Sequence, residues 1–307
     1  TRFRDLMKLT ILGCHSATPH ADKAPTAQLL STKKHHFLID CGEGTQVLLR
    51  KAKVKFAHIK HIFISHLHGD HFYGLPGLIS TFRLLGREAP LHIYGPVGIR
   101  EAVTLLLKLS DSWTNYPLHF HELSEKEPVC LFSDGEMEVH TIPLKHRVYT
   151  NGFLFRETPK ERKINPEAVK KLRIDQSQMR NLKQGKDVVN TDGESISNAQ
   201  LTHDPKPSKA YAFCSDTAYH PEITRQIQGV DVLYHEATFL DDNLELAKKT
   251  DHSTAKQAAQ IAKDANVNCL ILGHYSSRYK DLTLFQTEAA EIFPNVELAY
   301  DGYSLEF

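Results

Sequence analysis

The sequence predicts a layered α/β fold, and three observations carry that prediction. Strand-like and helix-like segments alternate through both halves of the 307-residue chain, a pattern typical of sheets covered by helices. Hydrophobic residues make up 41% and charged residues 24% of the chain, which is ordinary for a globular protein with a large core. Polar residues follow several of the strand-like runs, at the sheet edge where α/β proteins place their chemistry.

The elements follow from apolar periodicity and from the glycines and prolines that interrupt it. In the first half, strands are predicted at residues 8–13, 36–40, 61–65 and 91–96, and helices at 46–53, 78–85 and after Pro96 through Leu107. In the second half, strand-like patterns cover residues 137–155 (with a loop at 147–152), 209–216, 230–236 and 268–274. Residues 254–265 form an amphipathic pattern with Ser253 or Thr254 as the N-cap.

Residues 156–209 lose strong apolar periodicity and contain several prolines and glycines. This predicts an inserted arm or a poorly packed excursion. Residues 156–186 hold ten basic and four acidic residues, in a chain whose 37 Lys+Arg balance 37 Asp+Glu. The balance excludes a globally basic protein that holds nucleic acid by bulk charge, but it leaves room for a local basic patch.

Other features limit the class of protein. No run approaches 18 uncharged apolar residues, which predicts no membrane span. Residues 1–8 lack the apolar core and cleavage site of a signal peptide. The five cysteines form no Cys-x-x-Cys pair, which favours reduced, buried thiols in a cytoplasmic protein.

The chemistry concentrates in residues 66–71, His-Leu-His-Gly-Asp-His, directly after a predicted strand. His66 and His68 share a face in an extended segment, and Gly69 allows a turn that redirects Asp70 and His71 toward a second point. Imidazole and carboxylate ligands suit Zn²⁺ and tolerate Mn²⁺ or Fe. The alternative is a solvated polar loop, which the position at a strand end disfavours.

Four ligands from one loop do not complete two metal sites, but other strand ends supply candidates. His146, Asp216 and His274 each follow a predicted strand. Each alone is more often a cap or a satisfied polar group. Together they predict a site assembled from distant segments.

These residues resemble known patterns. Residues 66–71 match the His-x-His-x-Asp-His signature of the metallo-β-lactamase superfamily, and Asp40 matches its first motif. The narrower resemblance is to the ribonuclease Z family, with landmarks from about residue 8 to 303. It rests on residues 65–77, His235-Glu236-Ala237-Thr238-Phe239, His252-Ser253-Thr254 and 274–279.

The resemblance implies one metallo-hydrolase domain over residues 1–307, a four-layer αβ/βα sandwich, with a flexible basic arm at 156–208 inserted as an RNA exosite. It implies two Zn²⁺ ions per subunit, with Mn²⁺ or Fe possible in their place, and no organic cofactor or membrane partner. One ion would be held by His66, His68 and His146, the other by Asp70, His71 and His274, with Asp216 bridging them.

The implied activity is cytoplasmic removal of the 3′ trailer from precursor tRNA by metal-activated hydroxide, leaving a 3′-hydroxyl on the tRNA and a 5′-phosphate on the trailer. The family assigns Asp70 the role of accepting a proton from the attacking water. The departing alkoxide needs a general acid, and the resemblance favours His252 oriented by Glu236. The alternative for His252 is a helix-capping polar residue, and His235 is expected to be structural.

The resemblance also implies a homodimer whose arm binds the tRNA body, whereas the simpler alternative for the basic segment is a solvated charged surface. The loop at 18–26 has Pro19 and Lys23 but lacks the Arg-Asn pair of the family's Pro-x-Lys-x-Arg-Asn motif. The candidate RNA contacts are Arg278, Lys170, Lys171, Arg173, Lys183 and Lys186.

Two rival functions are weighed against this one. The first is another dinuclear hydrolase of the superfamily, acting on a small phosphodiester or a thioester, which the basic arm and the His252/Glu236 pair disfavour. The second is a non-catalytic RNA-binding or scaffold protein with a relic metal site, which the complete ligand set disfavours.

Overall fold

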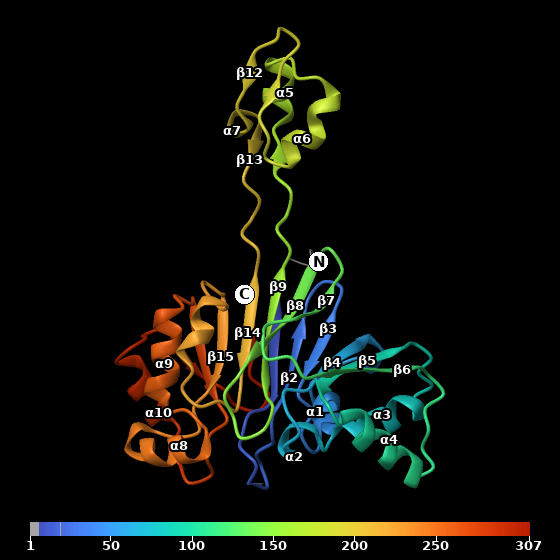
Figure 1. Cartoon of the computed structure of the whole chain (residues 1–307), viewed down its shortest axis with the longest axis vertical. Coiled ribbons are helices and arrows are strands. Elements are labelled where there is room, and N and C mark those ends of the chain that lie inside the picture. The colour runs from blue at the N-terminus through green and yellow to red at the C-terminus, as the bar shows by residue number, and fades with distance from the viewer. Residues whose placement is uncertain (1–5, 19) are drawn as a thin grey trace. The chain divides into compact units, whose positions relative to one another are not determined.

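The computed structural model describes residues 6–18 and 20–307. Residues 1–5 and Pro19 lie outside the described residues. Residues 1–5 make up most of the segment in which no signal peptide was expected, and Pro19 belongs to the 18–26 loop. Within the described part of the chain, the largest elements of structure are two seven-stranded sheets. Helices flank the pair of sheets on its two outer sides (Figure 1).

The first sheet has the strand order β18-β1-β2-β3-β4-β5-β6. Strands β3 to β6 are parallel, while β1 pairs antiparallel with both β2 and β18. The helices α1 (Thr45–Lys51), α3 (Leu75–Leu84) and α4 (Ile99–Leu109) share one apolar core with these strands. The strands are β1 (Lys8–Gly13), β2 (Ala27–Ser31), β3 (His36–Ile39), β4 (Ile59–Phe63), β5 (Leu91–Pro96), β6 (Leu118–Leu123) and β18 (Ser304–Glu306).

The second sheet has the strand order β17-β16-β15-β14-β9-β8-β7. Helix α9 (Ala255–Asp264) packs on β15 and β16, and α10 (Thr283–Ala290) packs on α9 and β17. Thr254 caps α9 in a capping box with Gln257, which confirms one of the two predicted N-caps. The strands are β7 (Cys130–Ser133), β8 (Met137–Pro143), β9 (Asn151–Glu157), β14 (Ala210–Cys214), β15 (Val232–Glu236), β16 (Cys269–Gly273) and β17 (Val296–Leu298).

Aromatic side chains fill the space between the two sheets. The ring of Phe63 on β4 lies with its centroid 5.4 Å from those of both Phe153 and Phe155 on β9. All three side chains are fully buried, and burial of such rings is a major source of core stability. The sheets therefore pack face to face with helices outside, which confirms the predicted αβ/βα sandwich.

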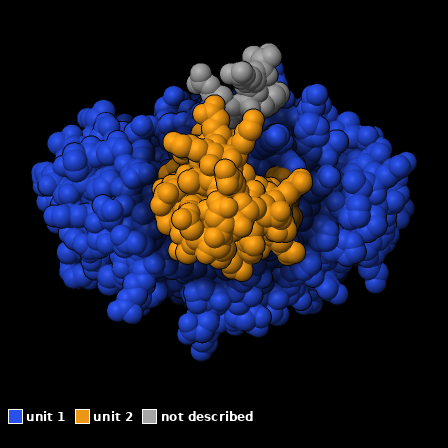
Figure 2. Space-filling view, turned by 90° about the horizontal axis from the view of Figure 1, so that it is seen from above, with its two compact units in different colours: residues 1–133, 139–155, 209–307 blue, residues 134–138, 156–208 orange. Residues whose placement is uncertain are grey.

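A second compact unit consists of residues 134–138 and 156–208 (Figure 2). Its elements are β10 (Lys163–Ile164), α5 (Pro166–Lys171), α6 (Met179–Lys183), β11 (Val188–Val189), β12 (Ser195–Ile196), α7 (Asn198–Leu201) and β13 (Thr202–His203). This unit has its own buried cluster of Ile174, Leu182, Val188, Ile196 and Leu201. Of the two alternatives for this segment, the poorly packed excursion is therefore wrong, because apolar residues from several short elements meet in one core.

The cysteines are all free thiols. Cys14, Cys41 and Cys214 are buried as expected, but Cys130 is exposed and Cys269 is only half-buried. The expectation of buried thiols is wrong for Cys130 because β7 is the last strand of its sheet. Among the described residues, no helix combines the length and the apolar character that crossing a membrane requires.

Candidate metal centre

The histidine-rich loop lies at the carboxyl end of β4. The strand ends at Phe63, and α2 (Gly69–Phe72) begins a few residues after it with Asp70 and His71 in its first turn. At the first residue of this helix, Gly69, a Cβ would lie 2.2 Å from the ring of Tyr73, so glycine leaves room for that ring. The turn therefore separates two ligand pairs, as the sequence predicted.

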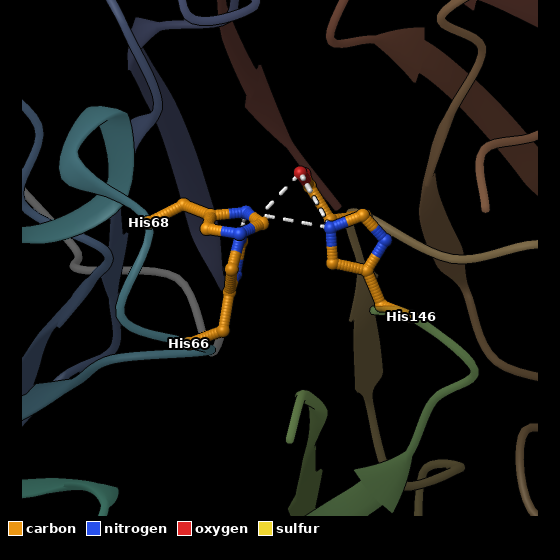
Figure 3. Close-up of side chains that lie close together, drawn as sticks. His66, His68 and His146 are labelled. Carbon is orange, nitrogen blue, oxygen red and sulfur yellow. Dashed lines mark hydrogen bonds and ion pairs between the residues drawn. The ribbon is translucent and has the colours of Figure 1, made fainter. Parts of the chain in front are cut away.

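Three imidazoles and one carboxylate oxygen form the first group of candidate ligands. His68 Nδ1 lies 3.1 Å from His66 Nε2 and 3.4 Å from His146 Nε2. Figure 3 shows these three rings turned toward one another, with His146 reaching in from a different segment. Oδ2 of Asp216 lies 3.5 Å from His66 Nε2 and 3.8 Å from His146 Nε2. All four donor atoms are close enough to share one ion.

The second group consists of Asp70, His71 and His274. Asp70 Oδ2 lies 3.3 Å from His71 Nε2 and 3.6 Å from His274 Nε2. Both of these nitrogens lie 3.2 Å from Oδ1 of Asp216. Asp216 thus directs one oxygen toward each group, and the structure brings all seven predicted ligands together.

The second nitrogen of most ligand imidazoles is held by an oxygen. Such partners fix the tautomer and the ring orientation of a metal-binding histidine. The contacts are Ser65 Oγ with His66 Nδ1 at 3.0 Å, Asp40 Oδ2 with His71 Nδ1 at 2.6 Å, the Asp251 carbonyl with His146 Nδ1 at 2.9 Å, and Thr238 Oγ1 with His274 Nδ1 at 2.9 Å.

Asp40 has a further anchoring role. Its carboxylate accepts hydrogen bonds from the backbone N–H and the hydroxyl of Ser65, at 2.7 and 2.8 Å. Asp40, Asp216 and His274 all have left-handed backbones, with φ of 57°, 61° and 60°. Residues other than glycine rarely adopt that conformation, so the backbone is strained at three residues of the site.

The residues fit a divalent cation on two observations. Nε2 of His71 and Nε2 of His274 are buried without a hydrogen-bond partner, which is costly unless something else satisfies them. In addition, burial lowers the pKa of His71, but the carboxylates of Asp216, Asp40 and Asp70 outweigh this and raise it well above its usual range. Such concentrated negative charge is what a divalent cation neutralises, and mixed imidazole and carboxylate donors are those that Zn²⁺ accepts.

Glu236 and His252 form a buried pair beside the ligands. His252 Nδ1 lies 2.6 Å from Glu236 Oε1, and the Glu236 side chain is fully buried. Burial lowers the pKa of His252, but the charge and hydrogen bond of Glu236 outweigh it and raise the pKa to about 9. The His252 ring also stacks on His274, with centroids 5.4 Å apart.

Thr238 is the site residue that sequence reasoning missed. Its hydroxyl lies 2.6 Å from Glu236 Oε2, 3.2 Å from His252 Nδ1 and 2.9 Å from His274 Nδ1. It therefore connects the Glu236/His252 pair with a candidate ligand. Its position in the His-Glu-Ala-Thr motif at 235–238 is the sequence feature that could have identified it as a site residue.

A cavity of about 440 Å³ opens onto these groups. Asp70, His252 and His274 line it together with Arg147 and Phe239. Arg278, predicted to contact RNA, is exposed, and its guanidinium lies 5.3 Å from the Phe239 ring centroid. His235 is not part of this arrangement, because it is buried with Nδ1 2.7 Å from the Glu236 carbonyl.

The predicted RNA contacts of the basic segment belong to the second compact unit. All of them are exposed. Arg173 lies 3.5 Å from Asp192, and Lys183 lies 3.5 Å from Glu161. Exposed pairs of this kind contribute little to stability, so these side chains can exchange their partners for phosphates. The residues are Lys170, Lys171, Arg173, Lys183 and Lys186.

Comparison with known proteins identifies the family. A protein of Bacteroides thetaiotaomicron named Ribonuclease Z is 47% identical over 96% of this chain and 93% of its own length. A Ribonuclease Z of Bacteroides fragilis is 46% identical over 96% of this chain and 97% of its own length. The chain belongs to the ribonuclease Z family. A different family, described as Anti-Pycsar protein Apyc1, matches residues 7–157.

Solved structures agree with the ribonuclease Z assignment. The crystal structure of human tRNase Z, short form, has a TM-score of 0.70 and 27% identity, covering 97% of this chain and 98% of that one. The metallo-β-lactamase fold protein YhfI of Bacillus subtilis, at 19% identity and a TM-score of 0.69, covers 99% of this chain and 100% of its own, and shares the fold. In this ribonuclease Z family member, the candidate ligands therefore lie in a metallo-β-lactamase fold.

Proposed function

We propose that this chain is a tRNA 3′-processing endoribonuclease that removes the 3′ trailer of precursor tRNA. The proposal rests most heavily on Asp216, whose two carboxylate oxygens face two separate groups of donors beside the Glu236/His252 pair. The names of the relatives and of the human structure support the substrate. The cytoplasm is the proposed location because precursor tRNA is the proposed substrate.

We propose two Zn²⁺ ions, with Mn²⁺ or Fe as alternatives. His66, His68 and His146 would hold one and Asp70, His71 and His274 the other, with Asp216 shared between them. When bound, such a pair of ions lowers the pKa of a shared water and neutralises charge on the phosphoryl oxygens.

The protein's own residues handle the protons. Asp70 lines the cavity and is the proposed acceptor of the proton from the attacking water. Burial raises the pKa of Asp70, but His71 and His274 lower it below its usual range, so the carboxylate stays ionised. His252 is the proposed donor to the departing 3′ oxygen, and Glu236 orients its ring. The products would be a 3′-hydroxyl on the tRNA and a 5′-phosphate on the trailer.

A substrate comparison tests this proposal. The purified protein is analysed for metal content and then given a precursor tRNA, a chromogenic phosphodiester and a thioester. We expect bound metal and cleavage of the precursor at the start of its trailer. Thioester hydrolysis alone would indicate another dinuclear hydrolase of the superfamily. Metal-free protein that binds tRNA without cleaving it would indicate a scaffold.

The second compact unit is the proposed RNA exosite, a basic arm over residues 156–208 inserted in a single metallo-hydrolase domain. Within this unit, residues 156–186 hold ten basic and four acidic residues, whereas the charged residues of 134–138 and 187–208 are mainly acidic. The segment 156–186 is therefore the proposed phosphate-binding part, and contacts to phosphate make affinity fall with salt. The separate core of the unit supports a binding element that keeps its own shape. Arg278 is the proposed phosphate contact at the cavity, because it lies over Phe239 in the cavity wall.

Removing the arm is expected to weaken precursor tRNA binding without impairing the chemistry. Replacing residues 160–205 by a short Gly-Ser linker should lower affinity at least roughly tenfold, since several phosphate contacts are lost. Hydrolysis of the chromogenic phosphodiester should be unchanged. Filter binding at several salt concentrations measures the affinity. The triple variant Lys170→Ala, Lys171→Ala, Arg173→Ala should show a smaller loss of affinity than the deletion. Lys263→Ala, outside the arm, is the control and should show none. Intact affinity in the deletion variant would refute the exosite.

The homodimer is proposed on an exposed apolar surface of α3 and α4. The two helices pack on each other, yet several large apolar side chains on and after them face solvent. Large exposed apolar side chains on two neighbouring helices favour an interaction surface there. The residues are Leu84, Leu85, Leu105, Leu106, Leu109 and Trp113.

Charging this surface is expected to convert dimer to monomer. Leu109 is 74% exposed, so Leu109→Asp should leave the fold intact while placing a carboxylate in the proposed interface. Sedimentation equilibrium measures the mass, and Val47→Asp, on the exposed side of α1, serves as the control. A wild-type protein that sediments as a monomer at micromolar concentration would contradict the dimer.

A further inference from the structure

A separate group of donor atoms lies in the turn that follows β1. Cys14 is the first residue after that strand, His15 follows it, and Asp301 belongs to the turn between β17 and β18. Cys14 Sγ lies 3.8 Å from His15 Nδ1 and 3.6 Å from Asp301 Oδ1. His15 Nδ1 lies 3.4 Å from the same carboxylate oxygen. A thiol, an imidazole and a carboxylate thus converge on one point.

The distances between these three donor atoms are similar to those between the ligand atoms of a tetrahedrally coordinated metal ion. Hydrogen bonds between nitrogen and oxygen are ~2.7–3.2 Å long, so the contact between His15 and Asp301 is longer than a hydrogen bond. An ion with tetrahedral bonds of ~2.3 Å to sulfur and ~2.1 Å to nitrogen and oxygen holds its donors about 3.4–3.6 Å apart. The three measured separations agree with those edges to within a few tenths of an ångström.

The surroundings also suit an ion. Cys14 is fully buried and His15 nearly so, while the Asp301 side chain is 22% exposed. Asp301 lines a cavity of about 470 Å³ with Asp22 and Lys23, so water can reach this carboxylate, although Cys14 and His15 do not line the same cavity. Oδ2 of Asp301 accepts a hydrogen bond from the Ala24 N–H at 2.7 Å, and Oδ1 accepts one from the Cys14 S–H at 3.6 Å. Loss of the thiol proton would free Oδ1 and Sγ together for an ion. A thiolate and a carboxylate together balance the charge of a divalent cation.

We propose that Cys14, His15 and Asp301 bind a divalent cation of the zinc class, separate from the centre at Asp216, with water from the adjacent cavity as the remaining ligand. Sulfur and imidazole donors favour zinc over Mg²⁺ and Ca²⁺, which are hard cations that prefer oxygen ligands. The site rests on its own residues and does not depend on the proposed RNA cleavage.

The position indicates what the ion stabilises. The Cys14 carbonyl accepts a hydrogen bond from the N–H of ligand His274 at 2.7 Å. The His15 N–H donates to the Ala24 carbonyl at 3.1 Å, closing the loop between them. Within that loop, Ser16, Ala17 and Thr18 line the cavity at the main centre. An ion joining Cys14 and Asp301 would therefore hold one wall of that cavity.

Cobalt substitution tests the site independently of activity. The purified full-length protein is stripped by chelation and loaded with Co²⁺. A thiolate bound to Co²⁺ gives a charge-transfer band in the near ultraviolet, whereas the centre at Asp216 contains only nitrogen and oxygen donors. We expect this band in the wild-type protein and its loss in Cys14→Ser, with one ion fewer per chain by elemental analysis.

Matched variants distinguish this site from the main centre and from the exposed thiol. Asp301→Asn should weaken the band while keeping the thiol, and Cys130→Ser, which alters the exposed cysteine, should leave the band unchanged. Asp216→Asn should lower the total metal content but keep the band. Loss of metal from the main centre can therefore be told apart from loss of the ion at Cys14. Circular dichroism checks that Cys14→Ser is folded. A wild-type protein without the band, or a folded Cys14→Ser protein that retains it, would overturn the proposal.

Discussion

Replacing Asp216 by alanine is expected to abolish metal retention at the main centre and to lower precursor tRNA cleavage by roughly 10³- to 10⁴-fold, since bound ions supply several kcal/mol of transition-state stabilisation. The reason is the position of its carboxylate, with Oδ2 near His66 and His146 and Oδ1 near His71 and His274. Loss of one side chain therefore affects both groups of donors.

Metal content and cleavage rate are to be measured in the same preparations. Asp216→Asn keeps the shape of the side chain but removes its charge, so it should lose metal while remaining folded. Asp264→Ala removes a carboxylate from the exposed end of α9 and should change neither quantity. If Asp216→Ala retained two ions per chain at the main centre, Asp216 would not be a shared ligand.

The His252→Ala variant is expected to keep its metal and lose most cleavage of precursor tRNA. General acid catalysis contributes roughly 10²–10⁴-fold, and the loss should fall in that range. Glu236 engages Nδ1 of His252, which leaves Nε2 as the nitrogen able to donate to a leaving group. The ring lies beside the ligands without being one of the seven described above, so the ions should remain.

The nature of the leaving group provides the decisive comparison. A nitrophenolate leaves without a proton, so His252→Ala should hydrolyse a chromogenic phosphodiester at close to the wild-type rate. Glu236→Gln should show the same selective defect in weaker form, and His119→Ala, on exposed β6, should show none. Equal losses on the two substrates would point to a disturbed site rather than a missing acid, and unchanged tRNA cleavage would remove His252 from the mechanism.

Much of the candidate centre was predictable because its candidate ligands lie at the ends of strands. Residues 66–71 follow β4, Asp216 follows β14 and His274 follows β16. Parallel strands bring their carboxyl ends to one edge, so residues far apart in sequence converge there. The tertiary contacts of Asp40 and Thr238 were not predictable in this way. Asp40 meets Ser65 across 25 residues and Thr238 meets His274 across 36, and no local pattern records such pairings.

Buried strands were easier to predict than exposed ones, although β2, with four of its five residues buried, was also missed. Strands β14 and β15 are buried along their whole length and begin as apolar runs, although β15 ends in His235 and Glu236. Strands β6 and β7 lie at the ends of their sheets with half of their residues exposed, and they were missed. The core of the second unit was missed because its five apolar residues are spread over residues 174–201, too widely for a helical or strand period.

The candidate ligands are divided between the two sheets of the sandwich. Residues 66–71 come from the first sheet, whereas His146, Asp216 and His274 come from segments that follow strands of the second. An ion bound by both sets acts as a crosslink between two halves of the core. Binding and folding are then thermodynamically linked, and the native state gains RT ln(1 + [metal]/Kd) for each site. The thermal midpoint of unfolding should accordingly rise with free metal concentration, so that the candidate ligands would also couple the protein's stability to its metal supply.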